Sequence, residues 1–252
     1  MNQPTYLTPN WPAPAKVKAQ TSLRIGGQSV GSYHSFNMAT HVGDDANLVA
    51  ANRERLRADL DIDRICWLDQ VHGVDTLKVT SLLSEQPSCA DASWTQQTDI
   101  ACAVLTADCL PLLVCDSEGT RVAAIHAGWR GLLNGVISNC LDKASFAPKN
   151  TLIWLGPAIG PSVYQVGSEV RQSFLESPYF AYLDVNSAFA TDVDGRFLCD
   201  LYQLAKLQLS ELGYLRIYGG DQCTSTQSDK YFSYRRDGQT GRMASLIWIS
   251  SE

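Results

Sequence analysis

The sequence lacks the features that mark membrane, exported or nucleic-acid-binding proteins. No uninterrupted apolar run reaches the roughly 18 residues that a membrane-spanning helix needs. The first 20 residues hold four prolines and no apolar run of the signal-peptide kind. Acidic residues outnumber basic ones by 26 to 20, so the net charge of −6 provides no basic field for a phosphate backbone. We therefore expect a cytoplasmic protein that binds neither membranes nor nucleic acids.

Several familiar catalytic motifs are also missing. The sequence contains no G-x-G-x-x-G, no G-x-x-x-x-G-K-[ST] and no H-E-x-x-H. It also lacks the H-x-E and P-C-x-x-C pair of cytidine-deaminase-type zinc enzymes. Dinucleotide-binding, P-loop and metalloprotease interpretations therefore lose their main support.

The eight cysteines include no C-x-x-C pair, and a chain of 252 residues without an export signal has little need of disulfides. Cys66, Cys102, Cys115 and Cys140 lie in apolar runs, which is typical of small core residues. Cys109 is the exception, because it stands at a break between two apolar runs.

The pattern of apolar residues predicts an α+β fold, with mixed β-sheets and helices packed on their outer faces. Helices are expected at 44–60, 132–145 and 200–212, the last with a capping-box-like pair, Asp200 and Gln203, and an end at Gly213. Strands are expected at 65–68, 74–79, 110–115, 121–125, 151–155, 215–218 and 244–249. We expect residues 1–20 to form an N-terminal leader and residues 21–252 a single catalytic domain.

Three polar residues stand at the ends of predicted strands, where functional sites collect. His72 precedes Gly73, Cys109 precedes Leu110-Pro111, and His126 begins the segment His126–Gly131. Two imidazoles and a thiolate suit Zn²⁺, and three protein ligands leave the fourth tetrahedral position for water, as in catalytic sites. The spacing fits no zinc finger, so the fold would have to assemble the site. Two buried histidines and a core cysteine remain the alternative explanation.

The segments around these residues resemble the signature of the YfiH family, also called the laccase-domain or peptidoglycan-editing-factor family. The resemblance covers nearly the whole chain and departs from the expected pattern at Phe36 and Met38, where leucines are usual. The segments that carry it are Phe36-Asn37-Met38, Val42–Asp45, Asn52-Arg53, Gln70–Gly73, Ala107–Pro111, His126–Gly131, Gly156–Gly160, Tyr164–Gly167 and Tyr231–Arg236.

This resemblance implies a zinc-dependent purine nucleoside enzyme with His72, Cys109 and His126 as both catalytic residues and metal ligands. Its substrates would be adenosine, inosine and methylthioadenosine together with inorganic phosphate, and it would also deaminate adenosine. The family also carries the name of a multicopper polyphenol oxidase. With four histidines and no H-x-H pair, the sequence favours zinc over copper, because a laccase needs many more histidine ligands.

Further residues are candidates for substrate binding. Arg130 and Arg235, with Arg236 beside it, are candidates for phosphate, since guanidinium groups match phosphate oxygens bidentately. Gln70 and Asp108 adjoin the proposed ligands, and Asn37 is a candidate for a purine edge or a ribose hydroxyl. Each has a structural alternative: an ion pair, a turn or a second-layer contact. Trp129 would stack a base or lie in the core, and His41 would line the pocket.

Two other functions remain open. A cysteine hydrolase would use Cys109 as nucleophile and His126 as base, and the resemblance makes a peptidoglycan precursor its substrate. A non-enzymatic protein would hold a structural metal. His72 separates these options, because a Cys–His dyad has no need of it.

Overall fold

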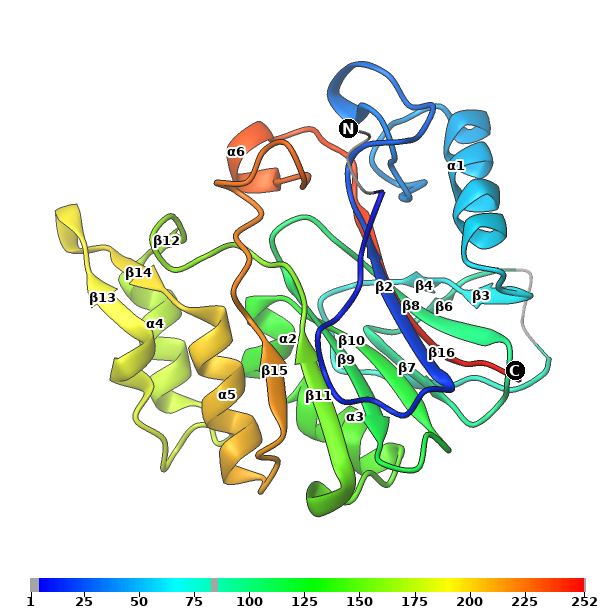
Figure 1. The fold of residues 1–252 in the computed structure, drawn as a ribbon. Coiled ribbons are helices and arrows are strands. Elements are labelled where there is room, and N and C mark those ends of the chain that lie inside the picture. The colour runs from blue at the N-terminus through cyan, green and yellow to red at the C-terminus, as the bar shows by residue number, and fades with distance from the viewer. Residues whose placement is uncertain (1–4, 83–85, 252) are drawn as a thin grey trace.

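Two β-sheets lie face to face at the centre of the chain, whose computed structural model describes residues 5–82 and 86–251. The first sheet has five strands, and β3 and β8 run parallel while the other neighbours are antiparallel. Its order is β1 (Tyr6–Leu7), β2 (Val17–Ser22), β16 (Met243–Ile249), β8 (Ile100–Thr106) and β3 (Arg64–Cys66). Figure 1 shows β2 and β16 side by side, although they come from opposite ends of the described chain.

The second sheet has six strands. Its pairs β5–β7 and β11–β15 are parallel, and the rest are antiparallel, which confirms the expectation of mixed sheets. Its order is β15 (Ile217–Gly219), β11 (Thr151–Leu155), β9 (Leu110–Asp116), β10 (Val122–Ala127), β7 (Ala92–Thr95) and β5 (Thr76–Lys78). The smaller sheets are β12 (Gln165–Val166), β14 (Phe197–Cys199) and β13 (Phe189–Thr191), and β4 (Leu68–Asp69) with β6 (Ser88–Cys89).

The central strands β9 and β10 are apolar along most of their length because both of their faces are buried. In β9, Leu112 and Val114 belong to the core beneath the helices, whereas Leu113 and Cys115 point into the core between the two sheets. This alternation follows from the two-residue period of a strand. Each fully buried aliphatic side chain contributes about 1.5–3 kcal/mol, so the two cores hold these strands firmly.

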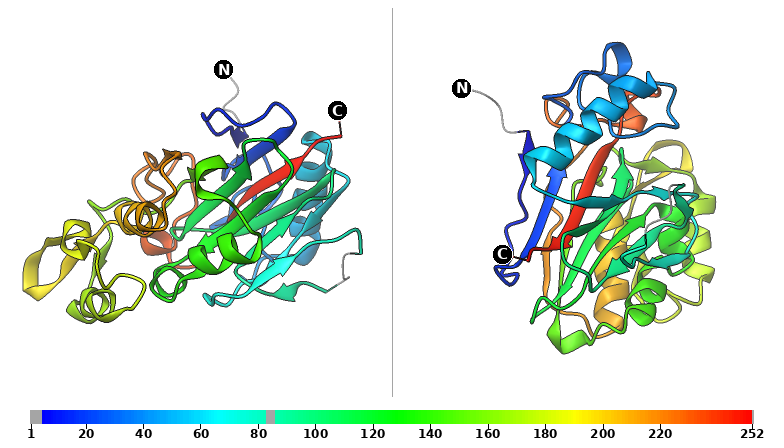
Figure 2. Two further views of the ribbon diagram at one scale, coloured as in Figure 1. Left: turned by 90° about the horizontal axis from the view of Figure 1, so that it is seen from below. Right: turned by 90° about the vertical axis from the view of Figure 1, so that its right-hand side faces the viewer.

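Helices cover the outer faces of the two sheets (Figures 1 and 2). One core joins α1 (Ala46–Asp59) to the five-stranded sheet, and the Asp45 side chain caps this helix by accepting from the N–H groups of Asn47 and Leu48. Another joins the six-stranded sheet to α2 (Trp129–Leu133), α3 (Val136–Lys143), α4 (Ser168–Glu176) and α5 (Leu201–Glu211). Short helical turns complete the fold: η1 (Gly31–Tyr33), η2 (Pro148–Asn150), η3 (Val185–Ala188), η4 (Val193–Gly195) and α6 (Tyr234–Asp237). The predicted α+β class is confirmed.

The structure corrects one expectation and adds strands. The single helix at 132–145 is wrong: α2 ends and α3 begins around Gly135, whose φ of 85° lies in the left-handed region and whose missing Cβ leaves room for the Tyr179 ring. The expected boundary after residue 20 falls within β2, and residues 1–4 of the expected leader lie outside the described residues. The strands that were not anticipated are β1, β2, β6, β7, β8, β12, β13 and β14.

The cysteines behave as expected. All eight are free thiols, and Cys66, Cys102, Cys115 and Cys140 are buried. No helix within residues 5–82 and 86–251 is long and apolar enough to cross a membrane.

Candidate metal centre

His72, Cys109 and His126 converge from three separate parts of the fold. The ligand atoms that they offer all lie within 4.8 Å of one another, and the Cys109 Sγ is 3.7 Å from the His72 Nε2. The two imidazole rings meet edge to face, with centroids 4.8 Å apart. Elsewhere in the described ranges no second group of three such ligands occurs.

The register of β9 and β10 explains how Cys109 and His126 come together. Ala127 pairs with Leu110 and His126 with Pro111, so Cys109, directly before Leu110, lies beside the end of β10. His126 is buried within that strand, whereas Cys109 is half-buried at the start of β9.

His72 reaches the same point from the exposed loop that follows β4. Its φ of 59° is left-handed, and the backbone N–H groups of Val71, His72 and Gly73 all donate to the carboxylate of Asp91. Asp91 precedes β7, which pairs with β10, and it also accepts from His126 Nδ1 at 2.7 Å. The sequence analysis missed Asp91. The available signal was a lone carboxylate at the start of a buried strand, which needs partners.

Gly128 lies against two of the proposed ligands, His72 and Cys109. A Cβ atom at this position would lie 2.8 Å from His72 Cδ2 and 3.1 Å from Cys109 Sγ. Its φ of −63° and ψ of 159° are open to any residue, so the need for glycine here comes from the neighbouring side chains.

The charges of the site favour a thiolate. Burial raises the pKa of the Cys109 thiol, but the charge and hydrogen bond of His126, together with those of His72, outweigh burial and lower the pKa to about 6. Burial likewise lowers the pKa of His126, whereas Cys109 and Asp91 raise it to about 9. A thiolate is the form in which cysteine binds a metal.

The donor set fits a zinc ion. With Zn–N near 2.0–2.1 Å and Zn–S near 2.3 Å, the nitrogen and sulfur ligands of a tetrahedral site stand about 3.5 Å apart. The observed separation of 3.7 Å between Cys109 Sγ and His72 Nε2 agrees with this value. Because Asp91 binds His126 through Nδ1, the Nε2 atom of that ring is left for the metal.

A cavity of about 350 Å³ opens beside these three residues. Its lining includes four of the predicted residues, Gln70, Asp108, Arg130 and Arg235. It also includes Trp129 and His41, and three residues that the sequence analysis missed, Tyr164, Tyr234 and Arg242.

Two of the arginines present free or partly free guanidinium groups to this cavity. Among the described residues, the Arg130 guanidinium has no hydrogen bond or ion pair, and it lies over the Trp129 ring at 4.4 Å. Arg235 is exposed, lies over the Tyr164 ring and donates one hydrogen bond, from Nη1 to the carbonyl of Gln165. Both retain N–H donors for an anion.

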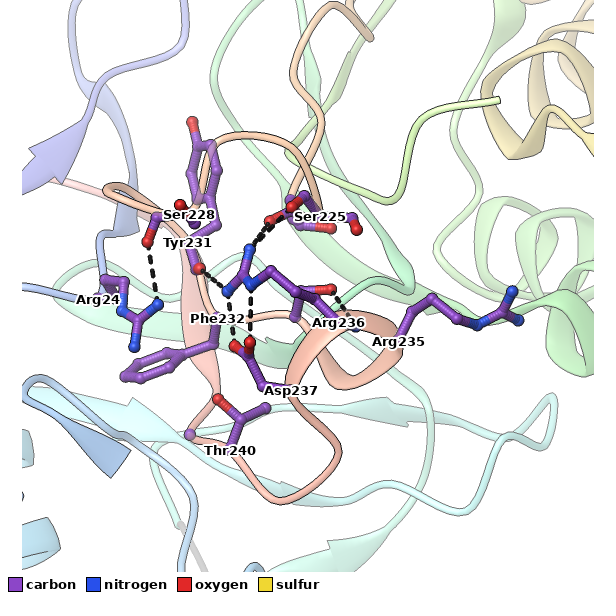
Figure 3. A network of polar contacts seen from close by, with 12 residues as sticks. Arg24, Ser225, Ser228, Tyr231, Phe232, Arg235, Arg236, Asp237 and Thr240 are labelled. Atoms are coloured by element: carbon purple, nitrogen blue, oxygen red, sulfur yellow. Dashed lines mark hydrogen bonds and ion pairs between the residues drawn. The ribbon is translucent and has the colours of Figure 1, made fainter. Parts of the chain in front are cut away.

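Arg236 has a different position from Arg235, as Figure 3 shows. Its guanidinium points into the preceding loop, where it donates to the carbonyl groups of Thr224, Ser225 and Tyr231 and pairs with Asp237. The Arg235 side chain extends away from this network. Arg236 is therefore a loop-holding residue, and its interpretation as a phosphate ligand is corrected.

Gln70 and Asp108 line the cavity but are largely occupied by the protein. The Gln70 amide accepts from the N–H of Leu105 and donates to its carbonyl. Asp108, whose φ is 99°, accepts from the Thr224 hydroxyl at 2.6 Å and from the Arg235 N–H at 2.7 Å. Both side chains therefore hold loops next to the proposed metal ligands.

Asn37 does not reach the cavity, which corrects its assignment to the substrate. It is completely buried, and its amide group makes four hydrogen bonds within the protein, to both backbone groups of Ala39, to Asp44 and to the Arg242 N–H. It thus supports the backbone of Arg242, which does line the cavity.

One hydrolase-like pattern went unnoticed in the sequence. Residues 27–31 match the G-x-S-x-G pattern of serine hydrolases. Ser29 is buried, donates to Asp44 and accepts from Asn52, and it lies in a loop rather than at the end of a strand. The pattern therefore carries no nucleophile here.

The chain is similar to a group of bacterial proteins over almost its whole length. Residues 18–250 match the family model described as multi-copper polyphenol oxidoreductase laccase. The chain is 45% identical over 248 residues to a protein named purine nucleoside phosphorylase from Pseudomonas aeruginosa, which covers 97% of this chain and 98% of the relative. It is 46% identical over 244 residues to the purine nucleoside phosphorylase YfiH of Escherichia coli, with coverage of 96% and 98%. A crystal structure of a Neisseria meningitidis protein matches with a TM-score of 0.92 at 42% identity, covering 98% of this chain and all of the other.

Proposed function

The chain belongs to the YfiH family, and on this premise we propose that it is a zinc-dependent purine nucleoside phosphorylase that also deaminates adenosine. The observation that carries the proposal is the convergence of His72, Cys109 and His126 at a cavity that Arg130 and Arg235 also line. Relatives named purine nucleoside phosphorylase support the choice of substrates.

The proposed reaction joins phosphate to the ribose of adenosine, inosine or methylthioadenosine. A phosphate oxygen bonds to the anomeric carbon, the bond from that carbon to the purine nitrogen breaks, and the proton that phosphate gives up ends on the departing base. His72, Cys109 and His126 would hold a zinc ion, which would supply Lewis acidity and would lower the pKa of a bound water to about 7. Deamination is a separate reaction at the purine ring, in which a water oxygen bonds to C6 of adenosine, the bond from C6 to the amino nitrogen breaks, and ammonia leaves with the proton of the water to give inosine.

The residues of the chain have separable roles in this reaction. Arg130 and Arg235 bind phosphate through their remaining N–H donors, and Arg242 adds a third positive charge to the cavity wall. The aromatic rings of Tyr164, Tyr234 and Trp129 offer apolar faces for the purine base. The eight free thiols accord with the proposed cytoplasmic location.

A laccase activity has no support in this site. The four histidines form no H-x-H pair, and only His72 and His126 belong to a three-ligand cluster in the described residues. A single centre of two nitrogens and one sulfur is comparable with a blue-copper site in its ligands. It provides no cluster of copper ions for the four-electron reduction of oxygen.

One observation favours a second candidate, the cysteine hydrolase. Asp91, His126 and Cys109 follow one another as orienting carboxylate, base and thiol, the order found in nucleophilic triads. Such a triad has no task for His72, whereas a zinc site requires it. Replacement of His72 therefore separates the two candidates.

The test combines metal analysis with product analysis. We expect the purified protein to contain one zinc per chain and to convert inosine and phosphate into hypoxanthine and ribose 1-phosphate. Both properties should be lost in Cys109→Ala and in His72→Ala, and both should persist in Cys89→Ala, which removes an exposed thiol away from the site. Full metal content in Cys109→Ala, or full turnover in metal-free protein, would end the zinc proposal.

A further inference from the structure

The carboxylate of Asp91 accepts hydrogen bonds from two of the three proposed metal ligands, His72 and His126. It is completely buried and accepts four hydrogen bonds. Its Oδ1 accepts from the His72 N–H at 2.9 Å and from His126 Nδ1 at 2.7 Å. Its Oδ2 accepts from the N–H groups of Val71 at 3.2 Å and Gly73 at 2.6 Å.

We propose that Asp91 is the positioning residue of the metal centre, which holds the proton of His126 on Nδ1 and the His72 loop in its ligand-presenting conformation. This inference rests on the proposed metal site. Its physical basis is that a neutral histidine carries one ring proton, and the partner of one nitrogen determines that the other is free to bind a metal. The same carboxylate sets the tautomer of one ligand and the backbone of the other.

Only a carboxylate satisfies this arrangement. Four N–H groups point at Asp91, two at each oxygen, and an ionised carboxylate offers acceptors alone. An asparagine of the same shape places an NH₂ group at one of the two positions. In one orientation this NH₂ faces His126 and the His72 N–H, and in the other it faces the N–H groups of Val71 and Gly73. Either the ring tautomer or the loop has to change.

A purely structural role for Asp91 would show itself differently. The backbone carbonyl of Asp91 accepts from the His126 N–H at 2.7 Å, and Ala92 pairs with Ile125, so the alignment of β7 with β10 does not depend on the carboxylate. Asp91→Asn therefore leaves the strands paired and changes the metal site. If Asp91 had only a structural role, Asp91→Asn would instead lower the stability of the whole domain.

The matched control lies at the other end of β10. Asp116 accepts from the Thr120 N–H at 2.6 Å, and its carboxylate likewise pairs with a neighbouring side chain, Arg121. Asp116→Asn removes a partly buried, hydrogen-bonded carboxylate from the β9–β10 turn without touching the metal centre. It reports how much an ordinary loss of this kind disturbs the protein.

The experiment measures zinc affinity by competition with a chromogenic chelator in the wild type and both variants, beside thermal unfolding of the metal-free proteins. We expect Asp91→Asn to bind zinc about 10- to 100-fold more weakly, the usual effect of replacing the partner of a metal-bound histidine, and Asp116→Asn to bind as the wild type does. Wild-type affinity in a folded Asp91→Asn overturns the inference while leaving the zinc proposal intact. A wild type that binds no zinc overturns the proposed function.

A second measurement needs no variant and applies even if Asp91→Asn fails to fold. Nitrogen-15 spectra of histidine-labelled, zinc-loaded wild-type protein report which ring nitrogen of His126 carries the proton when the ring is neutral. A proton on Nδ1 with the metal on Nε2 supports the role of Asp91. A metal on Nδ1, or an Nδ1 without a proton, contradicts it.

Discussion

The replacement Gly128→Ala should weaken metal binding strongly and leave the fold intact. The added Cβ would stand 2.8 Å from His72 Cδ2. Carbon atoms in ordinary contact stay about 3.5–4.0 Å apart, so the ring has to retreat by about 1 Å. Cδ2 is bonded to Nε2, which therefore moves by a similar amount. Metal sites tolerate deviations of only about 0.2 Å in ligand distance.

The expected loss of affinity is large, and the expected loss of stability is small. Displacement of a ligand should cost at least as much as loss of a ligand's hydrogen-bond partner, so we expect zinc affinity to fall by about 100-fold or more, about 3 kcal/mol. The backbone at Gly128 suits alanine, and such a replacement stabilises a fold by about 0.4–1 kcal/mol. The exposed His72 ring moves into solvent at little cost.

The assay is chelator competition for zinc together with thermal unfolding in EDTA. Gly73→Ala is the matched control, because a Cβ there meets nothing closer than Asp91 Oδ2 at 3.4 Å. We expect it to keep its zinc. A Gly128→Ala protein with wild-type zinc affinity would refute the proposed geometry of the site. A protein that loses several kcal/mol of stability along with its zinc would show that Gly128 serves the fold.

Three further predictions concern the thiol, the paired arginines and the break between α2 and α3. Because the pKa of Cys109 is lowered to about 6, this thiol should react with iodoacetamide in metal-free protein at a rate that falls as the pH drops through 6. Zinc should protect Cys109 from this reaction and leave Cys89 reactive. Mass spectrometry that finds both thiols equally protected would contradict the prediction. Arg235→Ala should raise the KM for phosphate without changing stability. Arg236→Ala, which loses charged hydrogen bonds to three carbonyl groups, should lower the free energy of unfolding by about 2 kcal/mol or more. The reverse pattern in kinetics and urea denaturation would show that these two roles are assigned to the wrong arginines. Gly135→Ala places a Cβ 2.4 Å from the Tyr179 ring at a residue whose φ is 85°. It should destabilise the protein by about 2 kcal/mol and leave zinc affinity unchanged. An unaltered melting temperature would argue against the described loop between α2 and α3.

Local pattern was sufficient to predict the elements with strong signals of their own. The helix at 200–212 was expected from its cap and its terminal glycine, and α5 spans Leu201–Glu211 with the Asp200 side chain accepting from the Gln203 N–H. The largely apolar strands β9 and β11 were also expected. By contrast, β8 was missed: its two alanines are of a type depleted in strands, although Ile100, Val104 and Thr106 favour them, and both of its faces pack into cores.

The candidate site likewise contains residues that could be predicted from the sequence and residues that could not. The three residues His72, Cys109 and His126 were singled out by residue type and by their positions near strand ends, and the structure brings them together. Asp91 was missed because its partners are 18 to 35 residues away along the chain. Asn37 was misjudged because a polar side chain in a sequence gives no sign of whether its hydrogen bonds are met by substrate or by neighbouring backbone.

The left-handed backbone conformations of His72 and Asp108 lower the stability of the fold while they serve the proposed site. Their φ values of 59° and 99° lie where residues other than glycine carry roughly 1–3 kcal/mol of strain each. Glycine would relax either loop, but at position 72 it would remove a proposed metal ligand, and at position 108 it would release Thr224 and the Arg235 backbone. A selection for heat resistance alone would therefore favour sequences that erase the centre. Substitutions meant to raise thermal stability should therefore leave these two loops unaltered and target the packed helices instead.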